Sequence, residues 1–511
     1  MESDPAIPPA SLQARLAQLN APQTAALRKR LAKRSADDAS RADALTAIPR
    51  ARPLRMEGDP PMAIFPASRS QQRLFFLQAL SPESPAYAIP MAFHLRGLLQ
   101  VRWLEDALRA VIRRHAALRT RFAFDASGIV QQVATDFRIP LEQDSLEAVP
   151  TGELRDAVDR RLRDVIVRPF DLEAAPPIRG MLVRLRPAEH LLLMVVHHIL
   201  FDGWSRAILL RDLSTAYASL AAGRPADLPP LPVQPADLSA WQTALEDAGG
   251  LARQEAYWVA ALARNLTPLD LPAERLRPAM PSFRGDRRRR PLNTALQTQL
   301  EVRAGEEGAT PFMLLLAGYA LLLRRETGRS DLIIGTPIAG RSRIEVEPLI
   351  GFFVNTLPLP ITVADRIPLR DLLRHVREVT LNAHAHPDLP LDRLIERLSL
   401  PRDPSRHLLV SVTFAVRTPS DEVLTLPGIE ATAWEVNTQT SKFDFSLTVE
   451  LSAGGWTAVA EYSTDLFEAP RVDRLLADWE TLLAGMAVNP DQSVGELIAR
   501  MDAGSGGVGG P

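Results

Sequence analysis

The chain has 511 residues, of which 46% are hydrophobic and 23% are charged, which is the composition of a globular protein of about two to four domains. Its net charge of −2 gives it no overall attraction to nucleic acid or to an anionic membrane surface. The lack of cysteine excludes disulfides, thiolate metal sites and a cysteine nucleophile, and we expect a cytoplasmic protein.

Residues 1–60 differ from the rest of the sequence. Leucines recur at helical spacing in "SLQARLAQLNAPQTAALRKRLAKR", and the proline-rich stretch "IPRARPLRMEGDPP" follows. We expect a helical linker or a docking segment here, and the pattern leaves both open. The start of the chain lacks the basic and apolar layout of a secretory signal.

Strands and helices alternate from residue 61 onward. The pattern predicts a strand over 86–97, helices over 101–122 and 152–170, and a hairpin over 177–200. The returning strand of that hairpin is almost entirely apolar, so we expect both of its faces to be covered. Ser205 is the predicted N-cap of a helix that ends at Gly223.

A proline-rich stretch near residues 221–241 separates this part from a second half. Helices are predicted near 238–262, 292–305, 311–326, 369–385 and 471–488, with strands over 331–340 and 352–363 and more between 408 and 463. The run 311–323 is too short to cross a bilayer and predicts a buried helix. We therefore expect an α/β fold of two sandwich lobes, residues 61–236 and 237–495, followed by a flexible tail over 496–511.

Two adjacent histidines, His197 and His198, end the apolar strand. Neighbouring strand side chains point to opposite faces, so one imidazole can face a cleft while the other faces the core. A cleft-facing imidazole can accept a proton from an attacking amine or hydroxyl. A plain pair of one core and one surface histidine is the alternative. No metal is expected, because no other cluster of histidine and acidic residues has ligand spacing.

Asp202 and Gly203 follow the histidines and predict a turn. A buried aspartate beside this turn needs a cationic partner, because an unpaired buried charge is costly. A serine hydrolase is not expected, since no G-x-S-x-G sequence is present.

The complete string "HHILFDGWS" over residues 197–205 resembles the HHxxxDGxS signature of condensation domains from nonribosomal peptide synthetases. The shorter HxxxDG pattern also occurs in chloramphenicol-acetyltransferase-like acyltransferases. Further strings resemble the other condensation motifs in their order, namely "ASRSQQRLFFLQ", "RHAALRTRF", "IGFFVNT", "HPDLPLDRL" and "RDPSRHLLVSVTF". The resemblance covers about residues 62–495. Departures from the usual motifs occur at Pro235, Leu238, Pro360 and His407.

The resemblance implies a fold, a reaction and partners. The fold is two chloramphenicol-acetyltransferase-like lobes in a V-shaped pseudo-dimer with a central tunnel, acting as a monomer. Donor and acceptor carrier proteins of adjoining synthetase modules present substrates on phosphopantetheine, and the domain itself binds no cofactor. The α-amine of the acceptor attacks the donor thioester and forms an amide, a step in antibiotic or other secondary-metabolite biosynthesis.

The resemblance also implies residue roles. His198 is the candidate base or amine-positioning group, and His197 supports it. Asp202 pairs with an arginine of the second half, with Arg341 as our first choice and Arg343 as the reserve, and Gly203 keeps the turn open beside the thioester. Structural support of the site is expected from Arg114, Arg119 and Asn355. Trp204 and Ser205 are candidate tunnel-lining residues, with a core position as the alternative for Trp204.

The subtype and two rival functions stay open at this point. The intact histidine pair argues against a heterocyclisation domain, and "DGWS" with "GFFVNT" favours condensation over epimerisation. The string "SPESPAYAIP" resembles the type that joins two L-configured residues, and a starter type with a fatty acyl donor is the alternative. The rivals are a free-standing HxxxDG acyltransferase and a non-catalytic recruitment module of condensation fold, although such modules tend to lose the histidine motif.

Overall fold

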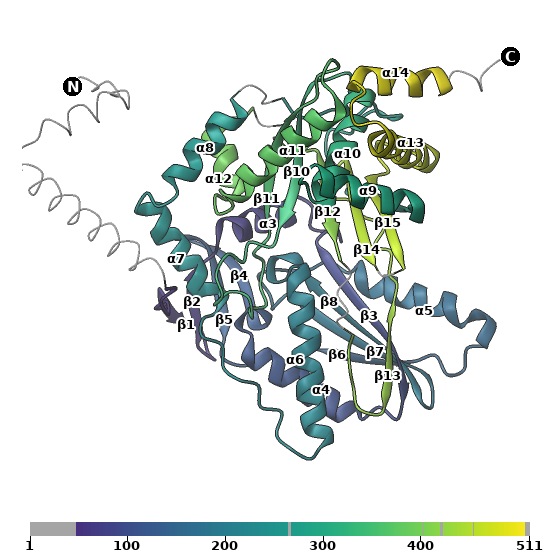
Figure 1. Cartoon of the computed structure of the whole chain (residues 1–511). Coiled ribbons are helices and arrows are strands. Elements are labelled where there is room, and N and C mark those ends of the chain that lie inside the picture. Colours follow the sequence, from purple (N-terminus) through teal and green to yellow (C-terminus); the bar gives the residue numbers. More distant parts are fainter. Residues whose placement is uncertain (1–46, 264–266, 402, 419–422, 453, 506–511) are drawn as a thin grey trace, which may run out of the picture. The chain divides into compact units, whose positions relative to one another are not determined.

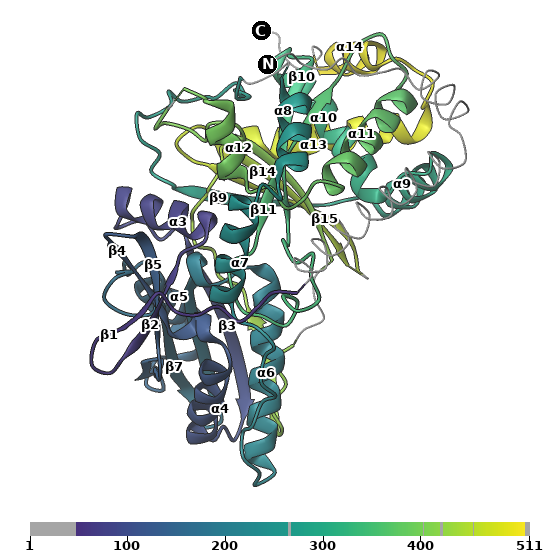
Figure 2. The same cartoon turned by 90° about the vertical axis from the view of Figure 1, so that its left-hand side faces the viewer.

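The computed structural model describes residues 47–263, 267–401, 403–418, 423–452 and 454–505. The chain divides into two compact units, Met1–Arg50 and Ala51–Pro511, and the second unit contains the elements described below (Figures 1 and 2). The helices expected within residues 1–46 lie outside the described residues. Within the described ranges, no helix combines the length and the apolar character that crossing a membrane requires.

The first half of the second unit builds two sheets. One is four-stranded in the order β1-β2-β5-β4, and the other is five-stranded in the order β13-β3-β8-β7-β6, in which β13 (Ile429–Trp434) comes from later in the chain. The strands are β1 (Arg55–Glu57), β2 (Met62–Pro66), β3 (Ala88–Gly97), β4 (Thr120–Asp125), β5 (Gly128–Ala134), β6 (Leu141–Ser145), β7 (Ile178–Arg186) and β8 (Glu189–His197). The helices are α3 (Arg69–Leu80), α4 (Val101–Arg114), η1 (Ala116–Arg119), α5 (Thr151–Ile166), η2 (His198–Leu200) and α6 (Gly203–Ala221).

Strand β8 is covered on both faces, as its apolar sequence predicted. Leu192, Met194 and Val196 pack into one hydrophobic cluster with side chains of α4 and α6. Leu191, Leu193 and Val195 pack into a second cluster with side chains of α5. Figure 1 shows these helices on the two sides of the sheet. The histidine pair therefore follows a strand that is held rigidly from both faces.

The second half contains the other α/β core. Its six-stranded sheet has the order β11-β10-β12-β14-β15-β9. Its strands are β9 (Gly285–Pro291), β10 (Asp331–Ile338), β11 (Asn355–Thr362), β12 (Val412–Arg417), β14 (Phe445–Ser452) and β15 (Gly455–Ser463). Its helices are α7 (Pro235–Asp247), α8 (Ala252–Leu262), α9 (Thr294–Glu306), α10 (Pro311–Thr327), α11 (Leu369–His384), α12 (Leu391–Leu398), α13 (Ala469–Val488) and α14 (Val494–Ser505).

Helix α10 is the buried helix that the apolar run predicted. All its residues from Met313 to Leu323 are buried. Thr310 caps its start by accepting a hydrogen bond from the Met313 amide, and Gly328 at its end has the positive φ of 70° that a left-handed cap requires. Helices α11 and α13 pack against it.

One strand of the second half belongs to the sheet of the first. Strand β13 (Ile429–Trp434) pairs antiparallel with β3, in a register that places Ala431 opposite Leu95 (Figure 1). The expected division into continuous lobes, 61–236 and 237–495, is therefore incomplete, because a strand from the second segment completes a sheet of the first lobe. Strand β11, which contains Asn355, is an edge strand of its own lobe and does not cross to the first.

Three boundaries differ from the sequence predictions. Residues 55–57 form β1, so the segment expected to end at residue 60 contributes a strand to the first lobe. The helix expected over 101–122 ends at Arg114, because the chain continues into η1 and β4. Residues 496–505, expected in a flexible tail, lie in helix α14, where Val494 and Leu497 are buried.

Candidate active site

His197 lies in the core at the end of β8. Its side chain is 1% exposed, and its Nδ1 accepts a hydrogen bond of 3.1 Å from the Ile199 amide. The Nε2–H therefore faces the Gln78 carbonyl oxygen, which lies 3.2 Å away. Burial, with the charges of Lys442 and Arg179, lowers the pKa of His197 to about 3. His197 is thus a neutral residue that fixes the end of the strand.

His198 begins η2 and is partly exposed. Its amide donates a hydrogen bond of 2.7 Å to the Tyr87 carbonyl oxygen. Its ring Nδ1 lies 2.7 Å from the Phe201 carbonyl oxygen, an acceptor, so Nδ1 carries the proton and Nε2 presents a lone pair. Burial, with the charge of Lys442, lowers the pKa of His198 well below its ordinary value. The residue is therefore a neutral acceptor at physiological pH.

The histidine pair also touches the second half of the unit. The His198 ring makes an edge contact with Phe352, at 4.9 Å between ring centroids. Phe352 belongs to the segment that precedes β11, so this segment covers the ring of His198 from the other lobe.

Asp202 is completely buried and joins the two lobes. Its Oδ1 accepts hydrogen bonds from the Ser205 amide at 2.8 Å and from Arg341 Nη2 at 3.0 Å. Its Oδ2 accepts from the Phe353 amide at 3.2 Å. Arg341 is 1% exposed and also donates from Nη1 to the carbonyl oxygens of Val346 and Leu349, each at 2.8 Å. The expected contact between Asp202 and Arg341 is therefore present.

The reserve partner, Arg343, does not occupy this place. Its guanidinium lies over the Trp241 ring at 4.8 Å, and its Nε is 3.9 Å from a Glu345 carboxylate oxygen.

The turn after the histidines corrects two expectations and removes one alternative. Asp202, and not Ser205, is the N-cap of α6. Ser205 is buried with its hydroxyl 2.7 Å from Asp202 Oδ1 and 3.0 Å from the Gly351 carbonyl oxygen, so it does not line a tunnel. Trp204 is 48% exposed, and its Nε1 donates to the Glu347 carbonyl oxygen at 3.0 Å, so it is not a core residue. The position at which α6 begins decides the N-cap, and the face of α6 that meets residues 347–351 decides the burial of Ser205 and the exposure of Trp204.

Gly203 is the first residue of α6. Its φ is not positive, so the turn does not need glycine for its backbone conformation. A Cβ built on Gly203 would meet no heavy atom within 4 Å. The missing side chain therefore leaves open space beside the site.

The three supporting residues make structural contacts. Arg114 Nη1 donates to Asp212 at 2.9 Å, and Arg119 donates to the Ala134 carbonyl oxygen. Asn355 donates from Nδ2 to the carbonyl oxygens of Pro387 and Leu389 at 3.0 and 2.8 Å, which holds the loop before α12.

His115 is a residue of the site region that the sequence analysis did not single out. It is buried, its Nε2 lies 2.7 Å from Asp212, and its Nδ1 accepts from the Ile350 amide at 3.4 Å. His115 thus ties α6 to the segment that carries Gly351. The string "RHAALRTRF", in which His115 directly follows Arg114, could have identified this residue from the sequence.

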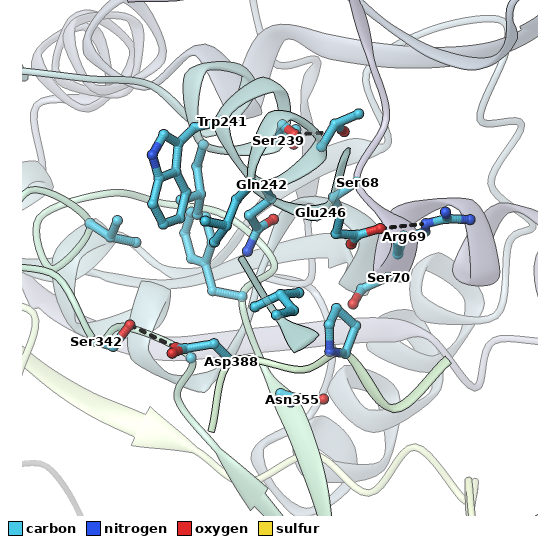
Figure 3. Close-up of a pocket in the computed structure, with 18 of the residues that line it drawn as sticks. Ser68, Arg69, Ser70, Ser239, Trp241, Gln242, Glu246, Ser342, Asn355 and Asp388 are labelled. Carbon is cyan, nitrogen blue, oxygen red and sulfur yellow. Dashed lines mark hydrogen bonds and ion pairs between the residues drawn. The ribbon is translucent and has the colours of Figure 1, made fainter. Parts of the chain in front are cut away.

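A cavity of about 340 Å³ lies between α3, α7 and the segments 340–346, 353–355 and 387–390 (Figure 3). The pairs Arg69–Glu246 and Ser342–Asp388 lie on its walls, with distances of 3.5 and 3.1 Å. Neither histidine lines it. Phe353 borders the cavity and donates its amide to Asp202, so the buried pair lies directly behind one wall.

Among the residues that the structure describes, no group of histidine and acidic side chains could hold a metal ion.

Comparisons with known proteins point to one family. The family model "Condensation domain" matches residues 62–503. The chain is 36% identical to the chondramide synthase cmdD of Chondromyces crocatus over 85% of its own length and 11% of that protein. It is also 36% identical to the phosphinothricin tripeptide synthetase PhsC of Streptomyces viridochromogenes, over 95% of this chain and 44% of that protein. The chain thus spans less than half of either relative.

A solved complex of the X-domain and OxyB from teicoplanin biosynthesis is similar in structure. It matches with a TM-score of 0.79 and 27% identity over 89% of this chain and 97% of the solved chain.

Proposed function

The chain belongs to the condensation-domain family, the amide-forming transferase domains of nonribosomal peptide synthetases, and we propose that it transfers a donor acyl or peptidyl group from a carrier-bound thioester to the α-amine of a carrier-bound acceptor. The observation that carries this proposal is the state of His198. Its Nδ1 is engaged by the Phe201 carbonyl oxygen, and its Nε2 makes no hydrogen bond within the described ranges.

The reaction needs alignment and one proton acceptor. The acceptor amine attacks the thioester carbonyl carbon, and a C–N bond forms while the carbonyl oxygen becomes an anion. Nε2 of His198 accepts the hydrogen bond, and then the proton, of that amine. The oxygen lone pair then re-forms the carbonyl, the C–S bond breaks, and the leaving thiol takes the proton back. Because a thioester is already activated, holding the two groups within about 3.5 Å supplies much of the rate.

Asp202 and Arg341 hold the two lobes in the arrangement that this step requires. Asp202 fixes the start of α6 immediately after the histidines, and Arg341 fixes the segment that ends beside Phe352 and Phe353. The pair therefore acts as a structural link and not on the substrate.

Reconstitution tests the proposal directly. The protein is incubated with a donor and an acceptor carrier protein, each loaded through phosphopantetheine, and amide product is followed by mass spectrometry. As a control, the same acyl group is offered on coenzyme A or on a short thiol at equal concentration. We expect kcat/KM to be highest with both carriers, because tethering gives the second substrate an effective concentration in about the millimolar range. Equal kcat/KM for all three donors would support a free-standing acyltransferase instead.

The same assay addresses the subtype. We propose that the donor is an L-configured aminoacyl or peptidyl group, on the resemblance of "SPESPAYAIP" to that type. Faster turnover of a fatty acyl donor than of L-aminoacyl donors would instead assign a starter domain.

The similarity to an X-domain gives a second candidate, a recruitment module. The TM-score of 0.79 to the X-domain in its complex with OxyB favours it. The open Nε2 of His198 argues for catalysis. No amide product with any loaded carrier pair, together with binding of an accessory enzyme, would favour recruitment.

A further inference from the structure

The lysine content of the chain singles out one position. Lysine and arginine together number 59, yet lysine occurs only at Lys29, Lys33 and Lys442. Every other member of this lysine and arginine set after Lys33 is therefore arginine. Lysine differs from arginine in carrying a compact point charge whose proton affinity responds to burial. The use of lysine at position 442 therefore needs a physical reason.

Lys442 lies in a firmly held segment just before β14. The neighbouring Ser441 donates its amide to the Phe283 carbonyl oxygen at 2.9 Å, and the Lys442 carbonyl oxygen lies 2.6 Å from His407 Nε2. Gly285 permits this approach, because a Cβ there would lie 2.5 Å from the Ser441 nitrogen. A small cavity of about 90 Å³ adjoins Lys442, Leu77 and Phe283. The second lobe thus holds Lys442 against the first.

The ammonium group reaches the segment that supports the histidines. Nζ of Lys442 lies 5.6 Å from the centre of the Tyr87 ring. Tyr87 accepts the backbone hydrogen bond of His198 through its carbonyl oxygen, and its ring centroid lies 6.1 Å from that of His197. Lys442, Tyr87 and the two histidines therefore form one cluster across the lobe interface.

Lys442 has no anionic partner within the part of the chain that the structure describes. No carboxylate there lies within ion-pair distance of it, and burial lowers its pKa. Glu461 is near enough to act on it electrostatically, but its carboxylate already pairs with Arg287 at 2.8 Å. Lys442 is partly buried and has no carboxylate partner in the described residues, so its charge carries a desolvation cost that a nearby negative charge would offset.

The other charged groups around the cluster leave it positive. Asp202 on the first lobe is engaged by Arg341. Arg179 on β7 acts on His197 in the same sense as Lys442, and Arg73 on α3 lies 3.3 Å from His407 Nδ1 and 3.5 Å from Asp392. Positive surroundings disfavour a protonated His198, whereas they favour an anion formed next to it.

We propose that Lys442 is an electrostatic positioning residue of the transfer reaction, whose ammonium charge offsets the oxygen anion that forms on the donor thioester beside His198. The inference rests on the proposed function. It also assigns the two tasks of the step to different residues: the imidazole of His198 accepts the proton of the amine, and the charge that stabilises the oxygen anion is on Lys442.

The test compares Lys442→Met, which keeps the length and removes the charge, with Lys442→Arg, which keeps the charge. We expect Lys442→Met to lower kcat at least about tenfold with KM for both carriers within about threefold, since removing one stabilising group of this kind costs about 10²–10³ when it touches the anion. Lys442→Arg should keep at least a tenth of the wild-type kcat. The acid limb of the pH–rate profile should move to higher pH in Lys442→Met, because His198 then protonates more easily.

A matched control is Arg288→Met, which makes the same change of charge on β9 at an exposed ion pair with Asp473. Its kcat should stay within about twofold of wild type. The inference is overturned by a Lys442→Met enzyme with kcat within twofold of wild type, by a loss confined to KM, or by a Lys442→Arg enzyme as slow as Lys442→Met. Wild-type protein that makes no amide would instead refute the proposed function, so the two failures are distinguishable.

A measurement on the wild-type protein covers the case in which Lys442→Met does not fold. The ε-carbon NMR signals of ¹³C-lysine are recorded for the full chain, and the Lys442 signal is assigned by its absence from Lys442→Arg. Two pantetheine-linked probes are added, a phosphonate that is tetrahedral and anionic, and a neutral amide of the same length. We expect the Lys442 signal to shift with the phosphonate only, and equal shifts or no shift with both probes would overturn the inference.

Discussion

Replacing Asp202 by alanine removes a completely buried carboxylate that links the two lobes. Arg341, 1% exposed, would lose the only carboxylate that it contacts within the described ranges, while keeping its bonds to Val346 and Leu349. Breaking one side of such a pair costs about 3–5 kcal/mol, because the remaining charge is buried without compensation. Loss of the N-cap of α6 adds about 1 kcal/mol. We therefore expect a loss of about 4–6 kcal/mol, which is a large part of the 5–15 kcal/mol typical of a folded protein.

Urea denaturation followed by tryptophan fluorescence measures this loss. Asp202→Asn is the matched control, because the amide oxygen still accepts from the Ser205 amide and the side chain keeps its shape. It should lose less free energy of unfolding than Asp202→Ala. The double variant of Asp202→Ala with Arg341→Met should lose about 1–3 kcal/mol less than the sum of the single variants, since neither charge is then left alone. An unchanged unfolding midpoint for Asp202→Ala, or strictly additive losses, would refute this reasoning.

Three further predictions concern the histidines and the adjacent turn. His198→Ala should lower kcat by about 10²–10⁴ with an unchanged melting temperature, and a near-normal rate in the carrier assay would move the proton-accepting role elsewhere. Gly203→Ala should keep or raise the melting temperature, because alanine favours the helix and its Cβ meets no atom. It should lower kcat, because the Cβ takes space that we assign to the substrate. An unchanged kcat would remove Gly203 from the site. The pKa of His197 is lowered to about 3 in the folded protein, so the unfolded state binds the proton first as pH falls. The free energy of unfolding should therefore be greatest above about pH 6.5 and decline toward pH 3, with a loss of about 2 kcal/mol at pH 5. His197→Gln should flatten this decline in urea midpoints measured between pH 7.5 and 5, and an identical slope would contradict the assignment.

Much of the site could be predicted from the sequence because its patterns are local. The nearly continuous apolar run predicted that both faces of β8 are covered, and the string 197–205 identified His198, Asp202 and the family to which the chain belongs. Arg341 could be named as the partner of Asp202 because it stands in a recognisable string of the second half, although 138 intervening residues separate the two positions along the chain.

The tertiary structure decided what depends on distance through space. Whether Trp204 or Ser205 is buried depends on the side of α6 that meets residues 341–353, and no local pattern encodes that contact. The pairing of β13 with β3 depends on a free edge in the other lobe. The lysine at 442 was visible in the sequence as an exception among arginines, but only the packing of its segment against Tyr87 brings its charge to the histidines. Sequence fixes an element through neighbours a few residues away, whereas the field around a catalytic group sums charges that the fold alone brings together.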